Sequence, residues 1–152
     1  MARILIKKLN PDVELPVYKT RGASGMDLMA FIKSPIKISP NSSYLVPTGL
    51  TMAFSEDYEI QIRPRSGLAA KNNITVLNTP GTIDSDYRGE IKIILFNHGK
   101  EDFIINNKDR IAQMVLTPVI KMKLEETDNL PDTLRGGGGF GSTGKWKANW
   151  IK

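Results

Sequence analysis

Short apolar or alternating segments recur along the chain, separated by turn residues, and helical periodicity is scarce. In Glu59–Arg63 apolar and polar residues alternate strictly, which is typical of a strand with one buried face. Strands are expected at residues 4–9, 28–32, 44–54, 58–63, 74–77, 91–96, 103–105 and 111–120. A short helix is expected after Ser66, through Leu68–Lys71. The pattern predicts an all-β fold, an antiparallel sandwich or barrel with one short helix.

The pattern changes near residue 125, where apolar runs give way to acidic and polar residues. Pro131 then interrupts the chain, and six of the ten residues in 135–144 are glycine. We interpret residues 1–152 as a single domain made of a β body (1–124), a connector (125–134), a glycine-rich arm (135–144) and a basic tail (145–152). A connector of this length would allow the arm to reach a neighbouring subunit.

Composition excludes several kinds of chemistry. The 152 residues are 40% hydrophobic and 24% charged, as expected of a globular chain. The absence of cysteine excludes disulfides, thiolate catalysis and cysteine-based zinc sites, and His98, the single histidine, is expected in a hairpin turn. No apolar run approaches the roughly 20 residues that span a bilayer, and no signal peptide is recognised, so we expect no membrane partner and a cytoplasmic location.

A net charge of +5 favours an anionic partner. The lysines of the tail alternate with Trp146 and Trp150, a pattern compatible with nucleic-acid binding. A solvated terminus whose tryptophans pack on the body is the preferred interpretation, so a nucleic-acid partner is not expected.

The glycine-rich arm carries a small set of chemical groups. Arg135 offers a forked donor to phosphate, the hydroxyls of Ser142 and Thr143 add further donors, and the ring of Phe140 can stack on a flat ligand. Glycine costs more backbone entropy to order than other residues, so the arm is expected to be flexible without a ligand. The arrangement indicates an arm that closes over a phosphorylated, ring-bearing ligand; a simple linker is the alternative.

Three loops of the body carry candidate functional groups. Arg63–Gly67 places arginine, a hydroxyl and glycine after a strand, which indicates a phosphate site or a structural turn. In Gly81–Gly89, Asp84 and Asp86 point the same way in an extended chain, with Tyr87 on the opposite face. An acid here could act as a general base that deprotonates water; the alternative is a polar hairpin with surface acids. Asp27 suits a role around magnesium through bound water, or structural hydrogen bonding.

Together these segments resemble the trimeric dUTPase family, over nearly the whole chain and in order. Five segments resemble its motifs one to five: Ser24–Leu28, Arg65–Leu68, Gly81–Gly89, Asp109–Gln113 and Arg135–Gly144. Departures are small, since Ser24 replaces a frequent alanine and Lys108 a frequent glycine. The resemblance implies a jelly-roll-like β fold and a homotrimer with sites at subunit interfaces, to which one subunit donates its fifth motif.

The resemblance also implies a hydrolase that converts dUTP and water to dUMP and pyrophosphate with Mg²⁺, limiting uracil in DNA and supplying dUMP for thymidylate synthesis. Asp84 would activate the attacking water, and Tyr87 would lie beneath the deoxyribose. The other residues that it implicates are Asn78 and the backbone from Thr82 and Ile83 to Lys92 at the uracil; Arg65, Ser66, Gly67 and Gln113 at the phosphates; Asp27 at magnesium through water; and Arg135, Phe140, Gly141, Ser142 and Thr143 of the arm.

Two other functions remain open. A dCTP deaminase would need an acid-base apparatus aimed at the pyrimidine C4, which we do not find, and the intact fifth motif argues against it. A non-catalytic nucleotide sensor on the same scaffold is expected to lose the base or the arm, whereas Asp84, Tyr87 and Phe140 are all present.

Overall fold

The computed structural model describes residues 2–139, which divide into two units. The compact unit ends at Ile120, and a second unit begins at Lys121. The strands are β1 (Leu5–Lys8), β2 (Met26–Met29), β3 (Ile36–Ile38), β4 (Ser43–Pro47), β5 (Leu50–Ala53), β6 (Tyr58–Arg63), β7 (Ile74–Val76), β8 (Gly81–Ile83), β9 (Lys92–Asn97), β10 (Phe103–Ile105) and β11 (Arg110–Pro118). The helix is α1 (Ser66–Asn72), as predicted.

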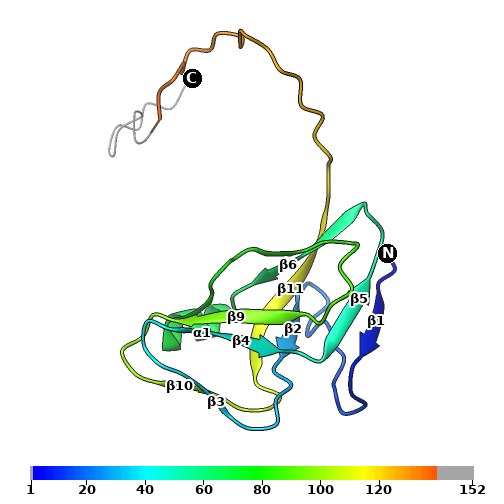
Figure 1. Ribbon diagram of the computed structural model, residues 1–152, viewed down its shortest axis with the longest axis vertical. Coiled ribbons are helices and arrows are strands. Elements are labelled where there is room, and N and C mark those ends of the chain that lie inside the picture. The colour runs from blue at the N-terminus through cyan, green and yellow to red at the C-terminus, as the bar shows by residue number, and fades with distance from the viewer. Residues whose placement is uncertain (1, 140–152) are drawn as a thin grey trace. The chain divides into compact units, whose positions relative to one another are not determined.

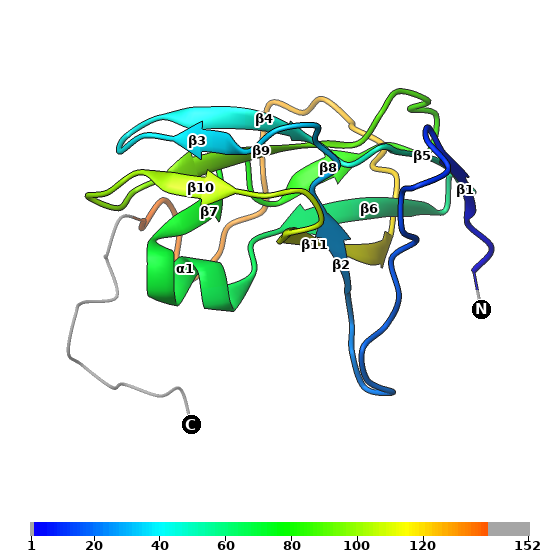
Figure 2. The ribbon, with the colours of Figure 1, turned by 90° about the horizontal axis from the view of Figure 1, so that it is seen from below.

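The strands form antiparallel sheets arranged in two layers (Figures 1 and 2). One layer contains the four-stranded sheet β2-β11-β6-β8, and the other contains the three-stranded sheet β4-β9-β7. Two further pairs, β1-β5 and β10-β3, flank them. The predicted all-β antiparallel sandwich with one short helix is therefore confirmed.

The core lies between these layers and is made of aliphatic side chains. In β6, Ile60 and Ile62 are buried, while the residues between and beside them are partly or fully exposed, as the alternation predicts. Ile93 and Leu95 of β9 are buried in the same way from the other sheet. Each buried aliphatic side chain contributes about 1.5–3 kcal/mol relative to exposure.

Several boundaries differ from the prediction. The apolar run 44–54 divides into β4 and β5 because a turn at Thr48 and Gly49 interrupts it. The run 28–32 gives a strand that starts two residues earlier, at Met26. The prediction missed β3 and β8, which have only three residues each. His98 lies in a turn, but β9 and β10 pair with other strands, so it does not form a hairpin.

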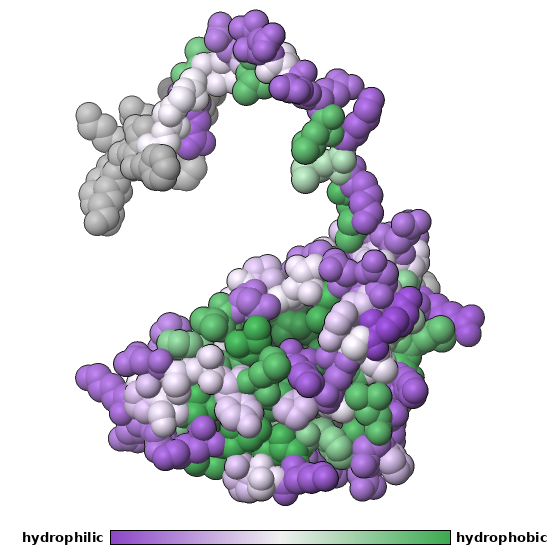
Figure 3. All heavy atoms as spheres, viewed as in Figure 1, coloured by the Kyte–Doolittle hydropathy of each residue, from purple (hydrophilic) through white to green (hydrophobic). Residues whose placement is uncertain are grey.

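The surface of the compact unit keeps some apolar side chains. Figure 3 shows apolar residues reaching the surface on the face where Figure 1 shows β4 and β9. Leu45 of β4 is 51% exposed.

Within residues 2–139, no helix has the length and apolar character needed to cross a membrane.

In the second unit, residues 121–139 form neither helix nor strand. Arg135 Nε donates to the carbonyl of Gly138 at 2.8 Å, and Gly136 has φ of 50°, a conformation that glycine adopts without strain. The predicted arm residues Phe140, Gly141, Ser142 and Thr143 lie outside the described residues. The predicted divisions at 125, 135 and 145 stay predictions.

Candidate active site

The register of the four-stranded sheet brings the first group of predicted site residues together. Gln113 of β11 lies opposite Asp27 of β2 on one side and opposite Arg63 of β6 on the other. Arg65 follows β6 directly, so the chain leaves the sheet beside Asp27. Residues far apart in sequence therefore meet because β11 lies between β2 and β6 in the sheet.

Asp27 forms ion pairs with two arginines. Its Oδ1 accepts a hydrogen bond from Arg65 Nε at 3.0 Å, and its Oδ2 accepts one from Arg110 Nη1 at 3.0 Å. Arg65 also donates from Nη1 to the carbonyl of Arg110 at 3.0 Å. The side chains of Asp27 and Arg65 are only 20% and 25% exposed, which strengthens the pairing relative to a surface pair. The guanidinium of Arg65 is thus oriented by two partners.

Gln113 is held beside this cluster. Its Nε2 donates to the carbonyl of Pro64 at 3.0 Å, in the residue that precedes Arg65. A Cβ on Gly25 would lie 2.9 Å from Gln113 Oε1 and 3.0 Å from the carbonyl of Met114, so a larger residue would crowd β11 here. Ser66 and Gly67 begin α1 and are exposed. Arginine, amide and hydroxyl donors accessible in one place suit a phosphate chain.

The second group of predicted site residues extends from β8. Asp84 and Tyr87 follow this strand directly, and both are exposed. The hydroxyl of Tyr87 donates to the carbonyl of Glu90 at 3.0 Å, and a Cβ on Gly89 would lie 2.3 Å from that hydroxyl. The ring therefore lies against Gly89. Asn78 lies over Gly81, the first residue of β8.

Lys92 begins β9 at the end of the same loop. Its Nζ lies 3.6 Å from Glu90 Oε2. Arg88 Nη1 donates to the carbonyls of Ser85 and Tyr87, at 2.6 and 3.0 Å, which closes the loop on itself. The exposed ring and carboxylate thus stand on a loop with its own hydrogen bonds.

The two groups stand on neighbouring strands, β6 and β8, of one sheet. Within residues 2–139, none of the hydrogen bonds or ion pairs joins Asp27, Arg65 or Gln113 to the residues from Asn78 to Lys92. Arg135 belongs to the second unit and contacts Gly138. We call the cluster of Asp27, Arg65 and Gln113 and the loop of Asp84 and Tyr87 the two half-sites.

Asp27 and its neighbours fit a magnesium ion that is bound mainly by the phosphates of a substrate. Among residues 2–139, no group of three or more histidine, cysteine or carboxylate side chains has metal-binding geometry. Both oxygens of Asp27 already accept arginine donors, and each retains a lone pair. Magnesium usually keeps several waters and binds substrate phosphates, so one carboxylate reached through water is compatible with it.

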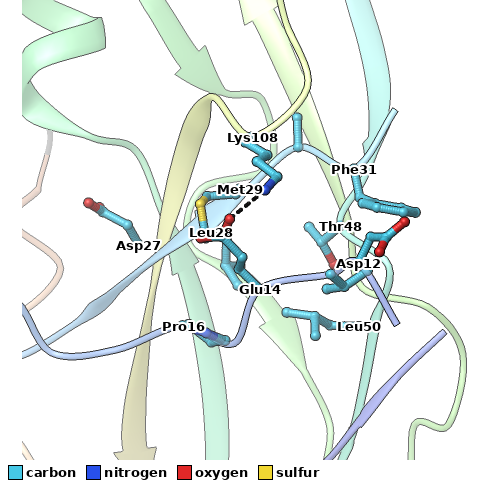
Figure 4. A pocket seen from close by; sticks show the side chains of 12 residues that line it. Asp12, Glu14, Pro16, Asp27, Leu28, Met29, Phe31, Thr48, Leu50 and Lys108 are labelled. Atoms are coloured by element: carbon cyan, nitrogen blue, oxygen red, sulfur yellow. Dashed lines mark hydrogen bonds and ion pairs between the residues drawn. The ribbon is translucent and has the colours of Figure 1, made fainter. Parts of the chain in front are cut away.

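The small cavity behind Asp27 is not a nucleotide site. Its volume is about 10 Å³, room for about one water molecule. Figure 4 shows the Asp27 carboxylate pointing away from this cavity, and Lys108 paired with Glu14 beside it. Their Nζ and Oε1 lie 2.6 Å apart. The Lys108 ammonium lowers the pKa of Glu14, and the Glu14 carboxylate raises the pKa of Lys108.

Two residues without a predicted role take part in these half-sites. Arg110 holds both Asp27 and Arg65, and its place in the fourth motif-like segment was the available signal. Glu90 accepts the hydrogen bond from Tyr87 with its backbone and one from the Gly49 amide with its side chain. Its position next to Gly81–Gly89 gave no sign of that second contact.

Comparisons with known proteins agree with the resemblance. The chain matches the sequence model of the dUTPase family over residues 12–144. It is 53% identical to deoxyuridine 5'-triphosphate nucleotidohydrolases of Nautilia profundicola (94% of this chain, 99% of the relative) and Rickettsia massiliae (95% and 98%).

Solved structures share the fold. A dUTPase of Staphylococcus bacteriophage 80alpha with dUpNHpp superposes with a TM-score of 0.81 at 20% identity, over 94% of this chain and 99% of that one. A dUTPase of phage phi11 of S. aureus, described with a structural Mg(II) ion, gives 0.76 at 17%, over 86% and 99%. The likeness confirms the jelly-roll-like β fold, and with the sequence matches it shows that the chain belongs to the dUTPase family.

Proposed function

We propose that this hydrolase of the dUTPase family cleaves dUTP between its α- and β-phosphates, giving dUMP and pyrophosphate. The observation that carries the proposal is the arrangement of the half-sites, one built of phosphate donors and one of an exposed carboxylate beside an aromatic ring. Relatives at 53% identity are named for the same substrate.

In the proposed reaction Asp84 accepts a proton from water. The water oxygen forms a bond to the α-phosphorus, and the bond from that phosphorus to the bridging oxygen breaks. Pyrophosphate leaves with the electron pair. A carboxylate can act this way when it lies within hydrogen-bond reach of the water. Arg65, Ser66, Gly67 and Gln113 hold the phosphates, and bound Mg²⁺ would screen their charge.

Selectivity in this proposal comes from the loop between β8 and β9. The ring of Tyr87 supports the deoxyribose and leaves no space for a 2′-hydroxyl. Asn78 and the backbone from Thr82 to Lys92 bind the uracil edge. A site that leaves buried polar groups unpaired with the wrong base rejects it by several powers of ten.

We further propose a homotrimer in which half-sites of different subunits meet. The support for this assembly is that, among residues 2–139, no hydrogen bond or ion pair joins Asp27, Arg65 and Gln113 to Asp84 or Tyr87. Arg135, Phe140, Gly141, Ser142 and Thr143 of one subunit would close over the nucleotide of another. Magnesium would bind the triphosphate, with Asp27 accepting from one of its waters.

A cytoplasmic enzyme of this kind would limit uracil in DNA and supply dUMP for thymidylate synthesis. Both the location and the physiological role are parts of the proposal. The main alternative is a nucleotide sensor without turnover, which would use the same donors.

Pyrophosphate release in the presence of magnesium tests the proposed reaction. We expect release from dUTP and not from UTP, dCTP or dTTP. Silence with dUTP, from protein shown to be folded, would favour the sensor. Ammonia release from dCTP would instead favour a deaminase.

The general base is tested by Asp84→Asn, with Asp86→Asn as the matched control in the same loop. We expect Asp84→Asn to lower turnover by at least about 100-fold while nucleotide binding, measured by calorimetry, is largely kept. Asp86→Asn should retain turnover. Retained activity in Asp84→Asn would contradict the assignment.

A further inference from the structure

The loop that carries Tyr87 is held by a turn from another part of the chain. Four hydrogen bonds join Thr48–Thr51, at the turn between β4 and β5, to Arg88–Ile91, before β9. Two come from threonine hydroxyls: Thr48 Oγ1 donates to the carbonyl of Ile91 at 2.6 Å, and Thr51 Oγ1 to that of Arg88 at 2.8 Å. We call these four bonds the threonine clamp.

The other two bonds of the threonine clamp involve the backbone. The Gly49 amide donates to Glu90 Oε1 at 2.9 Å, and the Ile91 amide donates to the carbonyl of Leu50 at 2.8 Å. Together the four bonds involve the carbonyls of Arg88 and Ile91, the carboxylate of Glu90 and the amide of Ile91. The end of the loop is thereby fixed in both position and rotation, because several separated bonds oppose twisting.

The turn itself is buried and closely packed. Thr48 is 1% exposed, and its hydroxyl is satisfied only through Ile91 among the hydrogen bonds of the described residues. Gly49 has φ of 68°, and a Cβ there would lie 2.5 Å from Val13 Cγ2, so the backbone is packed closely from behind. A buried turn of this kind is a firm anchor for an exposed loop.

The residues held by the threonine clamp are those that position the Tyr87 ring. Its hydroxyl donates to the carbonyl of Glu90, and the ring lies against Gly89, between two clamped positions. Arg88, Glu90 and Ile91 therefore fix the support of the ring, while the ring itself is 44% exposed and open to a ligand.

We propose that the threonine clamp sets the discrimination between deoxyribose and ribose, with Thr51 and Glu90 as positioning residues for Tyr87. The inference rests on the proposed function, in which Tyr87 lies beneath the sugar. A ring excludes a 2′-hydroxyl only if it is held closely in place, and misplacement by about 1 Å is enough to change rates strongly. A loosened clamp admits ribose and weakens the fit of deoxyribose.

The test compares kcat/KM for dUTP and for UTP in Thr51→Val, Glu90→Ala and Glu90→Gln, with enzyme in excess for the slow substrate. Valine removes the hydroxyl of Thr51 at similar volume. Alanine removes the acceptor for the Gly49 amide, whereas glutamine keeps it. Thr75→Val is the matched control, because Thr75 lies in β7 and its hydroxyl bonds only locally, to Val76 at 3.4 Å.

We expect the dUTP-to-UTP ratio to fall about fivefold in Thr51→Val and Glu90→Ala, the effect of losing one hydrogen bond. Glu90→Gln and Thr75→Val should keep the ratio. Urea unfolding identifies any variant that has lost its fold, and the ratio is then taken from the remaining variants.

The outcomes separate the two ideas. If the wild type does not hydrolyse dUTP, the proposed function fails. If the wild type is active but Thr51→Val and Glu90→Ala lower kcat/KM equally for dUTP and UTP, the threonine clamp is only structural and the inference is overturned. An equal fall of the ratio in Thr75→Val overturns it as well.

Discussion

At Asp27 one carboxylate is shared between two guanidinium groups, with each oxygen 3.0 Å from its arginine. Such charge-assisted bonds are about twice as strong as neutral ones, and they fix the direction of a planar donor. The arrangement assigns Asp27 a direct contact with Arg65. That contact is independent of any magnesium ion.

Asp27→Asn tests which role dominates. The amide keeps the shape but loses the charge, so Arg65 and Arg110 lose their common partner. We expect kcat/KM for dUTP to fall on the order of 10- to 100-fold, and the loss to persist at saturating magnesium. A loss that excess magnesium restores would favour the metal role.

The control for this variant is Asp102→Asn. Asp102 also pairs with a cation, Lys37, at 3.0 Å, but on the surface of the β10-β3 pair. Its removal should leave kcat/KM unchanged. A comparable loss there would show that a change in overall charge, rather than the arginine contacts, explains the effect.

The ion pair of Glu14 and Lys108 gives a pH prediction. The pKa of Glu14 is lowered in the folded state, so its contribution is present above its unfolded pKa and is lost as pH falls through the folded value. The pKa of Lys108 is raised, so its contribution is present below its unfolded pKa and is lost as pH rises through the folded value.

Glu14→Gln should therefore destabilise the protein slightly at neutral pH and have less effect in acid, below the ordinary glutamate pKa of about 4.3. Both side chains are 54% exposed, so salt should weaken the difference. Urea unfolding of the wild type and Glu14→Gln, at neutral pH and in acid, with and without salt, measures this difference in stability. An equal difference in acid would mean that the ion pair is not its source.

The sequence identified most residues of the half-sites but not the contacts between them. Asp27, Arg65 and Asp84 were identified from the sequence because charged groups in glycine-containing segments stand out, whereas Gln113 was identified only through the resemblance to the fourth motif. The pairing of Asp27 with Arg110 was not foreseen, because it depends on the register of β2 against β11. Sequence spacing does not specify that register, since the two strands are far apart in the chain.

At the scale of elements, the approach of β2 to β11 depends on Gly25. A Cβ there would lie 2.9 Å from Gln113 Oε1 and 3.0 Å from the carbonyl of Met114. Gly25→Ala must displace a backbone or the proposed phosphate donor, so we expect a loss of about 1–3 kcal/mol in the free energy of unfolding. Gly22→Ala, with no atom within 4 Å of its Cβ, should cost little.

Urea unfolding measures both substitutions. A small effect of Gly25→Ala would show that the strands separate easily at this point. Gly25→Ala should also weaken nucleotide binding more than Gly22→Ala, because the added methyl group displaces Gln113.

Strand prediction succeeded where an alternating or apolar run was bounded by polar residues on both sides. Residues 58–63 and 103–105 were predicted with the observed bounds, and 58–63 shows strict alternation across the core. The strands β3 and β8 were missed because each adjoins a turn signal, Ser39–Pro40 and Thr79–Gly81, that outweighed its three residues. The division of 44–54 has a local signal, the turn residues Pro47–Gly49, and the bond from the Thr48 hydroxyl to Ile91 holds that turn in place.

At the scale of the whole molecule, the arm is predicted to act apart from the body. Deletion of residues 135–152 leaves every strand of the compact unit in place. We therefore expect the truncated chain to keep its unfolding transition while turnover falls at least about 100-fold, because water is no longer excluded from the nucleotide. An unchanged rate would refute the arm proposal.

Whether the arm crosses between subunits is tested by mixing two inactive chains. Asp84→Asn has an arm but no base, and the chain lacking 135–152 has a base but no arm. If each site takes its base and its arm from different subunits, random co-assembly restores about one quarter of the sites. If each arm serves its own chain, co-expression restores none, because no site then combines an intact Asp84 with an arm. Pyrophosphate release from the co-expressed mixture, against each chain alone, distinguishes the two arrangements.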